Sequence, residues 1–299
     1  MLRADNIARV IEACGDGLVL DVGGWADPFP RADYVIDYFT YETRRLAYHG
    51  IHRLPVTVRY PDPLPGERFT RERWVVHDIC GPNPFPFPDR MFDFVICSHT
   101  LEDIRDPIRV CAEMMRVGKA GYIETPSRLA EQTMGVESAP GMVGYAHHRW
   151  LVEYGKQSIV FRPKPYHLHT DPALHVPRSF LRRRGESALT DFLFWKDAFR
   201  AEEIWAFDAR DEAARFVASL GIPPADYRAE RREQRRRRRQ LRFQPAAQRY
   251  RQFRMWLGRV RRGRFRAPTA ESPPAELWTW ATLFKAARPS SAAEPGTDE

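Results

Sequence analysis

Residues 77–127 read HDICGPNPFPFPDRMFDFVICSHTLEDIRDPIRVCAEMMRVGKAGYIETPS, and this stretch decides the fold. The dense prolines of residues 82–88 exclude a helix and predict a loop. Residues 92–98 are short and apolar, which predicts a buried strand. Residues 106–118 have the periodicity of an amphipathic helix that ends at a glycine, and residues 121–127 predict a second strand. A strand, a helix and a further strand indicate a parallel pair.

The same alternation extends toward the N-terminus. A helix is expected over residues 4–13, followed by strands at 18–22, 33–39 and 73–79. A short helix is expected at 41–50, and the Pro-rich residues 55–65 look irregular. The predicted fold class is therefore α/β, with a Rossmann-like, doubly wound, mostly parallel sheet.

Polar residues end the predicted strands. Ligands bind beyond the carboxyl ends of such strands, so these side chains are expected to meet at one rim of the sheet. They are Asp21, Asp37, Asp78, Ser98, His99 and Glu124.

Five short motifs in the deciding stretch carry a family resemblance. They are FPFPD at 85–89, FD at 92–93, CSHTLED at 97–103, DP at 106–107 and RVGKAG at 116–121. In this order and spacing the chain resembles the class I S-adenosylmethionine-dependent methyltransferases, in particular the type 11 group. The resemblance covers roughly Val19 to Ser127.

The resemblance implies a set of cofactor-binding residues. Asp37 would accept both ribose hydroxyls, and Asp78 would accept the adenine amine, with Ile79 beside the ring. The remaining candidates are Asp21, Gly23, Gly24, Tyr38, Ser98 and His99. An ordinary turn or cap carboxylate is the alternative interpretation of each Asp.

The loop after the first strand departs from the family pattern of acidic-x-Gly-x-Gly-x-Gly. Trp25 and Asp27 stand at the second and third glycine positions, where a side chain hinders close approach of the backbone to a ligand. The segment DPFPRAD, which follows Ala26, cannot form a regular crossover helix, so no helix N-terminus would face the cofactor's carboxylate. Arg31 could replace it, or could be a simple surface arginine.

Methyl transfer depends strongly on positioning and needs a general base only when the acceptor holds its proton tightly. The catalytic candidates are His99, Glu102, His147 and His148. A packed or surface imidazole is the alternative for each His. The family's usual His after the Glu is here Asp103, which removes one potential base. Five imidazoles fall within residues 147–175, but without Cys or a fixed acidic spacing no metal site is predicted.

The later chain is expected to complete this core. Residues 128–148 predict a covering loop, 149–163 a β-hairpin that turns at Gly155, 202–209 a strand and 211–221 a helix. The expected division is a cofactor-binding core at 1–127, a completing and acceptor-side region at 128–222, and a basic helical extension with a disordered tail at 223–299.

Composition sets the class of protein. The 299 residues are 43% hydrophobic and 12% aromatic, which suits a chain with a real core. No apolar run approaches a membrane span, the start lacks a signal-peptide pattern, and the four cysteines are widely spaced. A cytoplasmic protein with free thiols is expected.

Charge is unevenly distributed. Residues 228–266 hold 17 Arg and two Glu, a net of +15, so the remainder carries −7 against the total of +8. This basic segment predicts an anionic partner, either nucleic acid or acidic lipid, or else a simple solvated helix. Three hypotheses follow: a methyltransferase for a small-molecule or glycan-type acceptor, a non-catalytic methyltransferase-like binding protein, and an RNA methyltransferase.

Overall fold

The computed structural model describes residues 4–44, 66–136, 142–205 and 208–236. The chain divides into two compact units, Met1–Arg235 and Arg236–Glu299. All described residues except Arg236 thus belong to the first unit. The expected Pro-rich segment at 55–65, most of the helix at 41–50 and most of the Arg-rich segment lie outside the described residues.

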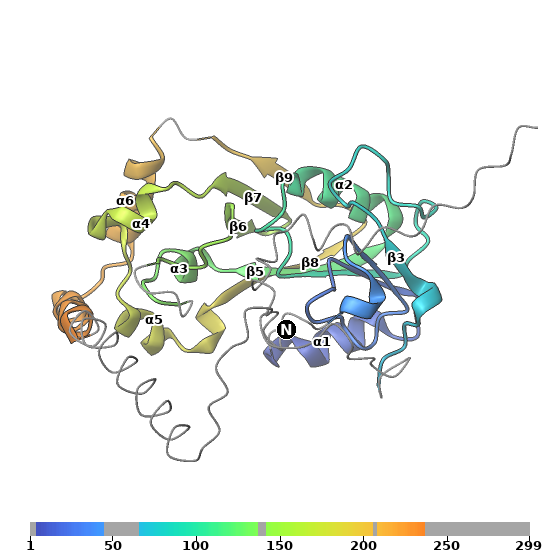
Figure 1. Ribbon diagram of the computed structural model, residues 1–299, viewed down its shortest axis with the longest axis horizontal. Helices are drawn as coiled ribbons and strands as arrows, with labels where there is room; N and C mark the ends of the chain where they lie inside the picture. The colour runs from blue at the N-terminus through green and yellow to red at the C-terminus, as the bar shows by residue number, and fades with distance from the viewer. Residues whose placement is uncertain (1–3, 45–65, 137–141, 206–207, 237–299) are drawn as a thin grey trace, which may run out of the picture. The chain divides into compact units, whose positions relative to one another are not determined.

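A six-stranded sheet forms the centre of the first unit (Figure 1). Its order is β3-β2-β1-β4-β5-β8, with the first five strands parallel and β8 antiparallel to β5. The strands are β1 (Val19–Val22), β2 (Tyr34–Asp37), β3 (Trp74–Val76), β4 (Phe94–Ser98), β5 (Ala120–Pro126) and β8 (Thr190–Lys196). The strand order reverses between β1 and β4, so their carboxyl ends form the topological switch point where ligands bind in such sheets. The predicted doubly wound, mostly parallel sheet is confirmed.

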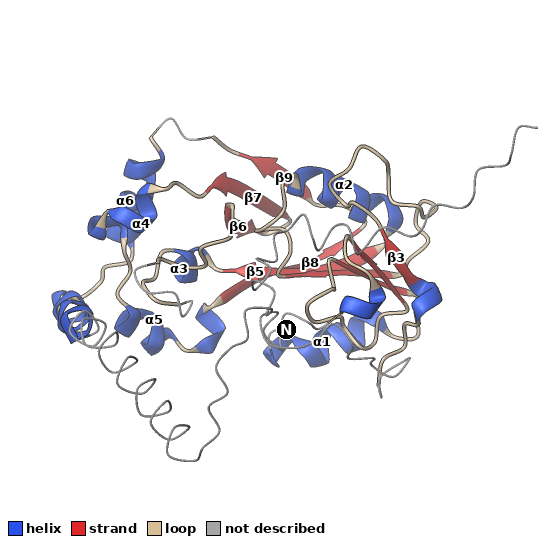
Figure 2. Ribbon diagram, in the orientation of Figure 1, coloured by secondary structure: helices blue, strands red, loops and turns tan. Residues whose placement is uncertain are grey.

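Two helices cover opposite faces of this sheet (Figure 2). α1 (Ala4–Cys14) buries Val10 and Cys14 in a cluster with one face of the sheet. α2 (Pro107–Val117) buries Val110 and Met114 in the cluster on the other face. α2 begins where Asp106 accepts a hydrogen bond from the Arg109 amide at 3.0 Å. Both helices were expected from their apolar periodicity.

A second, three-stranded sheet lies on the same side as α2 (Figure 1). It consists of β6 (Trp150–Gly155), β7 (Ser158–Pro163) and β9 (Arg200–Glu203). β6 and β7 form the predicted hairpin, with Gly155 opposite Ser158. β9 pairs in parallel with β7 and ends at Glu203, so the strand expected at 202–209 starts and ends earlier than predicted.

Residues 224–236 form a helix within the expected helical extension. The other helices are α3 (Arg128–Glu131), α4 (His167–Thr170), α5 (Arg178–Arg184), α6 (Ala209–Ser219) and the 3-10 turns η1 (Tyr41–Thr43), η3 (Arg71–Arg73), η4 (Pro172–Leu174) and η5 (Glu186–Ala188). α6 is the helix expected at 211–221. Within the described part of the chain, every helix is too short or too polar to cross a membrane.

The connection between β1 and β2 is the most unusual feature of the sheet. Residues 23–33, all of them described, contain turns and no helix. Pro28 and Pro30 account for this, because proline removes backbone donors that a helix needs. The predicted absence of a crossover helix is confirmed.

Candidate functional site: a cavity at the carboxyl ends of β1 and β4

A cavity of about 520 Å³ opens at the switch point of the main sheet. Its volume falls in the range of roughly 300–1,000 Å³ that is common for small-molecule sites. Among the residues that line it are Asp21, Gly23 and Gly24 after β1, Ser98 and His99 after β4, and Ile7 and Ile11 of α1. Five of the predicted cofactor-binding residues therefore surround one cavity.

Two glycines shape the wall after β1. Gly23 has φ +76°, and a Cβ there would lie 2.4 Å from the side chain of Thr100. A Cβ on Gly24 would lie 2.3 Å from a carboxylate oxygen of Asp21. Glycine is therefore required at both positions, although the later glycines of the family pattern are missing.

Asp21 is the buried acid of this wall, with 3% of its surface exposed. Its Oδ2 accepts a hydrogen bond from the Phe29 amide at 2.8 Å. Burial raises the pKa of Asp21 to about 7, and the nearby carboxylates of Asp37 and Asp27 add to the shift. A cationic group in the cavity would restore the ionised form.

Trp25 occupies the space beyond the end of β2. Its ring stacks on Phe39 at 4.3 Å, and its Nε1 donates to the Thr43 carbonyl at 2.7 Å. Its amide donates to Oδ2 of Asp37 at 3.0 Å, while the Phe39 amide donates to Oδ1 at 2.8 Å. The residue that breaks the glycine pattern is thus the residue that engages the predicted ribose ligand.

The four other predicted cofactor residues lie away from the cavity. Asp37 is 6% exposed, and burial raises its pKa to about 6 against the opposing backbone amides. Tyr38 and Asp78 are exposed at the ends of β2 and β3, and Ile79 is buried in the core. None of these four side chains lines the cavity described above.

Arg31 has a structural role. Its guanidinium donates to the carbonyls of Gly15 and Gly17 and pairs with Asp33 at 3.0 Å. These contacts tie the end of α1 to the loop before β2. Arg31 is therefore neither a simple surface arginine nor free to bind a ligand without breaking them.

His99 lines the cavity and also contacts two buried carboxylates, Glu102 and Glu124. Together with His148 and Glu131 they form a row of neighbouring charged side chains, the carboxylate chain. His99 has φ +53°, a conformation that is strained for a residue with a side chain. Its Nε2 lies 3.1 Å from Oε1 of Glu124, and its Nδ1 lies 3.6 Å from Oε1 of Glu102. Burial alone would lower the pKa of His99, but the two carboxylates outweigh it and raise the pKa to about 9. At neutral pH His99 is therefore an imidazolium.

Glu102 lies between His99 and His148, which belongs to the segment before β6. It is 1% exposed, and neither carboxylate oxygen has a hydrogen-bond partner in the described structure. Its Oε1 lies 4.0 Å from Nε2 of His148. The Nδ1 of His148 lies 2.6 Å from Oε1 of Glu131, and Lys164 is 2.5 Å from the other oxygen of Glu131. His148 is thus buried with carboxylates on both sides.

The predicted catalytic residues form two groups. His99, Glu102 and His148 belong to the connected chain, whereas His147 is 56% exposed and lies 3.8 Å from Asp103. Of the other imidazoles considered for a metal, His169 accepts from the Val143 amide and His175 contacts the Leu168 carbonyl. These two rings serve the fold.

Sequence reasoning missed Glu131 and Lys164. No motif marks either residue, because their partners lie 17 to 33 positions away along the chain. Glu124 was expected at the rim, but its contact with His99 was not. The polar ending of an otherwise apolar strand is the signal that could have paired them.

Cys97 lies within β4 below the cavity and is buried. Burial raises the pKa of its thiol well above the ordinary value, so it stays protonated. All four cysteines are free thiols in the structure.

Comparison with known proteins finds a family model that matches part of this site. The family model described as a methyltransferase domain, of type 11, matches residues 65–125. That range holds β3, β4, α2 and most of β5, and it includes Ser98 and His99 of the cavity. No curated protein matches the sequence.

Solved structures of methyltransferases are similar to this chain at low identity. A SAM-dependent methyltransferase from Aquifex aeolicus is 19% identical over 42% of this chain and 64% of its own, with a TM-score of 0.26. An S-adenosylmethionine-dependent methyltransferase from Mesorhizobium loti is 14% identical over 54% of this chain and 64% of its own, with a TM-score of 0.30. The chain thus spans 64% of the length of each of these proteins.

The family match and the observed sheet agree. The matched residues supply the β3, β4 and β5 region of a sheet whose order and directions were established independently above. Residues 65–125 therefore match a methyltransferase domain, and the sheet that they help to build has a Rossmann-like, doubly wound arrangement.

Proposed function

We propose that this protein is an S-adenosylmethionine-dependent methyltransferase that acts on a small-molecule or glycan-type acceptor. The observation that carries the proposal is the cavity at the ends of β1 and β4, which adjoins the matched methyltransferase segment. The cofactor would lie against Asp21, Gly23, Gly24, Ser98 and His99.

Three features of the cavity fit such a cofactor. Ser98 has a buried Oγ without a hydrogen-bond partner in the described structure, and a bound ligand would satisfy it. Gly23 and Gly24 line the cavity without a side chain, so a ligand there would meet backbone. Asp21 supplies a carboxylate for the cationic ammonium or sulfonium of the cofactor.

Binding of the ribose requires a local rearrangement. A carboxylate offers about four acceptor positions, and backbone amides of Trp25, Tyr38 and Phe39 already approach Asp37. Acceptance of two ribose hydroxyls therefore needs the Trp25 amide to give way. We therefore expect the cofactor to bind more weakly than it would to a loop with all three glycines.

The bound cofactor would supply an electrophilic methyl group to the acceptor. His99, charged at neutral pH, would donate a hydrogen bond and position its neighbours instead of accepting a proton. Glu102 is the carboxylate beside it that could take the acceptor's proton, with Oε1 3.6 Å from Nδ1 of His99. His148 is held by Glu131 and would orient the same region.

A pair of serine variants tests the cofactor site. Ser98→Ala should leave the melting temperature of the free protein within about 2 °C, because Ser98 Oγ has no partner to lose. It should weaken the binding of S-adenosylhomocysteine by about tenfold, the cost of one hydrogen bond. Ser219→Ala, at the exposed end of α6, is the matched control and should change neither.

Calorimetric titration of both variants measures the effect. Equal affinity in Ser98→Ala and the native protein would remove this cavity as the cofactor site. Failure of the native protein to bind would favour the non-catalytic alternative, a methyltransferase-like binding protein. An RNA acceptor and an anionic partner for residues 228–266 stay predictions.

A further inference from the structure

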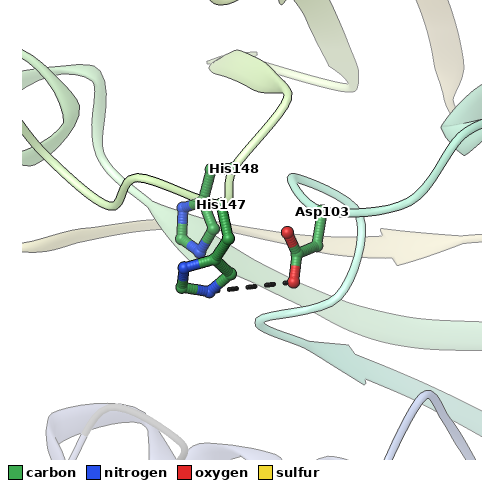
Figure 3. Close-up of side chains that lie close together, drawn as sticks. All are labelled: Asp103, His147 and His148. Carbon is green, nitrogen blue, oxygen red and sulfur yellow. Dashed lines mark ion pairs between the residues drawn. The ribbon is translucent and has the colours of Figure 1, made fainter. Parts of the chain in front are cut away.

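Asp103, His147 and His148 bring three metal-binding side chains together (Figure 3). One ligand atom from each lies within 4.8 Å of the others, and Nε2 of His147 is 3.8 Å from Oδ2 of Asp103. Asp103 lies in the turn after β4, and the two histidines lie just before β6. The fold thus joins segments more than 40 residues apart.

His148 is oriented for coordination. Its Nδ1 is 2.6 Å from Oε1 of Glu131. Glu131 is in turn held by Lys164, which also donates to the carbonyls of Val143 and Tyr145. A carboxylate on one imidazole nitrogen fixes the proton there and leaves the other nitrogen as a basic ligand, as in many metal sites. Nε2 of His148 is therefore available toward Asp103.

Glu102 supplies an independent sign that a cation belongs here. Its side chain is 1% exposed, neither oxygen has a hydrogen-bond partner in the described structure, and Oε1 is 4.0 Å from Nε2 of His148. A buried carboxylate without donors is costly unless positive charge lies nearby. His99 provides such charge on one side, and a metal ion would provide it on the other.

We propose that Asp103, His147 and His148 bind a divalent transition-metal ion of the Zn²⁺ class. Two imidazoles and one carboxylate favour Zn²⁺, Co²⁺, Ni²⁺ or Fe²⁺ over Mg²⁺ and Ca²⁺, which prefer oxygen ligands alone. Asp103 and His147 are 41% and 56% exposed, so the ion would keep at least one position open to water or another oxygen ligand.

Small side-chain movements would complete the site. Ligands bound at about 2.1 Å in tetrahedral geometry stand about 3.4 Å apart. The separations of up to 4.8 Å must therefore shorten by up to about 1.4 Å. His147 can make this movement because it is exposed, whereas His148 is held in place by Glu131.

Cobalt provides the test, because its visible absorption reports the coordinating ligands. The intact protein should bind one equivalent of Co²⁺ with visible bands typical of four or five ligands, and Zn²⁺ should displace it. His147→Ala and Asp103→Asn should each weaken binding by at least tenfold and reduce the bands. His167→Ala, which removes another exposed imidazole, is the matched control and should bind like the native protein.

The readout is independent of methyl transfer, so it separates this inference from the proposed function. Both ligand variants change exposed side chains, and unaltered melting curves will confirm that they fold. Absence of the visible bands in the native protein, or equal Co²⁺ affinity in native protein and His147→Ala, would overturn the metal site.

Discussion

Asp21 is a buried acid of the cavity, and its pKa is raised from 3.8 to about 7. A buried carboxylate is costly in its ionised form, and the single short hydrogen bond from Phe29 does not offset that cost. The raised pKa means that the folded protein holds a proton on Asp21 under conditions in which the unfolded chain has released it. Stability contributed by the neutral form is present below the unfolded pKa of 3.8 and is lost as pH rises to about 7.

Asp21→Asn should therefore remove a pH dependence. Relative to the native protein, the variant should gain about 4 kcal/mol in free energy of unfolding between pH 4 and pH 8. Urea unfolding across this range measures the difference, to which the titration of Asp37 contributes only through its smaller interaction with Asp21. A constant difference from pH 4 to pH 8 would show that Asp21 is not titrating in this window.

Trp25 holds the loop after β1 in a fixed position while the sheet stays regular. The indole stacks on Phe39 and bonds to Thr43, so it fixes the loop amide on Asp37. Trp25→Ala should free that loop and improve S-adenosylhomocysteine affinity by about three- to tenfold, the gain from one restored hydrogen bond.

The same variant should lower the free energy of unfolding by about 1–3 kcal/mol through lost packing. Trp205→Ala is the control, because Trp205 is 73% exposed and should affect neither quantity. Calorimetry and urea unfolding give the two numbers. Weaker binding in Trp25→Ala would mean that the indole contacts the cofactor instead of restricting it.

Among the elements, β5 is a strand of the main sheet with close backbone packing at Gly121. It lies between β4 and β8, and its Gly121 lies against the Trp195 ring. A Cβ at Gly121 would meet the Val95 carbonyl oxygen at 2.2 Å and the Trp195 ring at 2.7 Å. Neither a strand carbonyl nor a packed indole can move cheaply.

Gly121→Ala should cost about 3 kcal/mol in free energy of unfolding. Gly155→Ala is the matched control, since the atom its Cβ would meet is the hydroxyl of Ser158, which can rotate away. Its cost should stay below about 1 kcal/mol. Urea unfolding of both variants decides the point, and similar costs would contradict the packing described for β5.

Some of these elements could be predicted from the sequence and others could not. The strands that carry Ser98 and Glu124 near their carboxyl ends were predictable because each is an apolar run followed by polar residues. The missing crossover helix was predictable from Pro28 and Pro30. The bond from Trp25 to Asp37 was not, because it depends on how an irregular loop folds back. The contacts of His148 could not be predicted either, because no sequence motif marks Glu131 or Lys164.

At the scale of the molecule, the cavity and the carboxylate chain all lie within the unit Met1–Arg235. A chain that ends at Arg236 should therefore fold and bind S-adenosylhomocysteine within about twofold of the full chain. Circular dichroism and calorimetry check both points. Loss of binding on truncation would show that residues 237–299 contribute to the site.

Calorimetric titration of S-adenosylmethionine into the intact protein tests whether the cavity binds the cofactor. One saturable site is expected, with tighter binding at pH 8 than at pH 6, because the cation of the cofactor favours the ionised form of Asp21. Asp21→Asn should lose that pH dependence. Absence of binding heat at both pH values, with the protein shown to be folded, would contradict the assignment of this cavity to the cofactor.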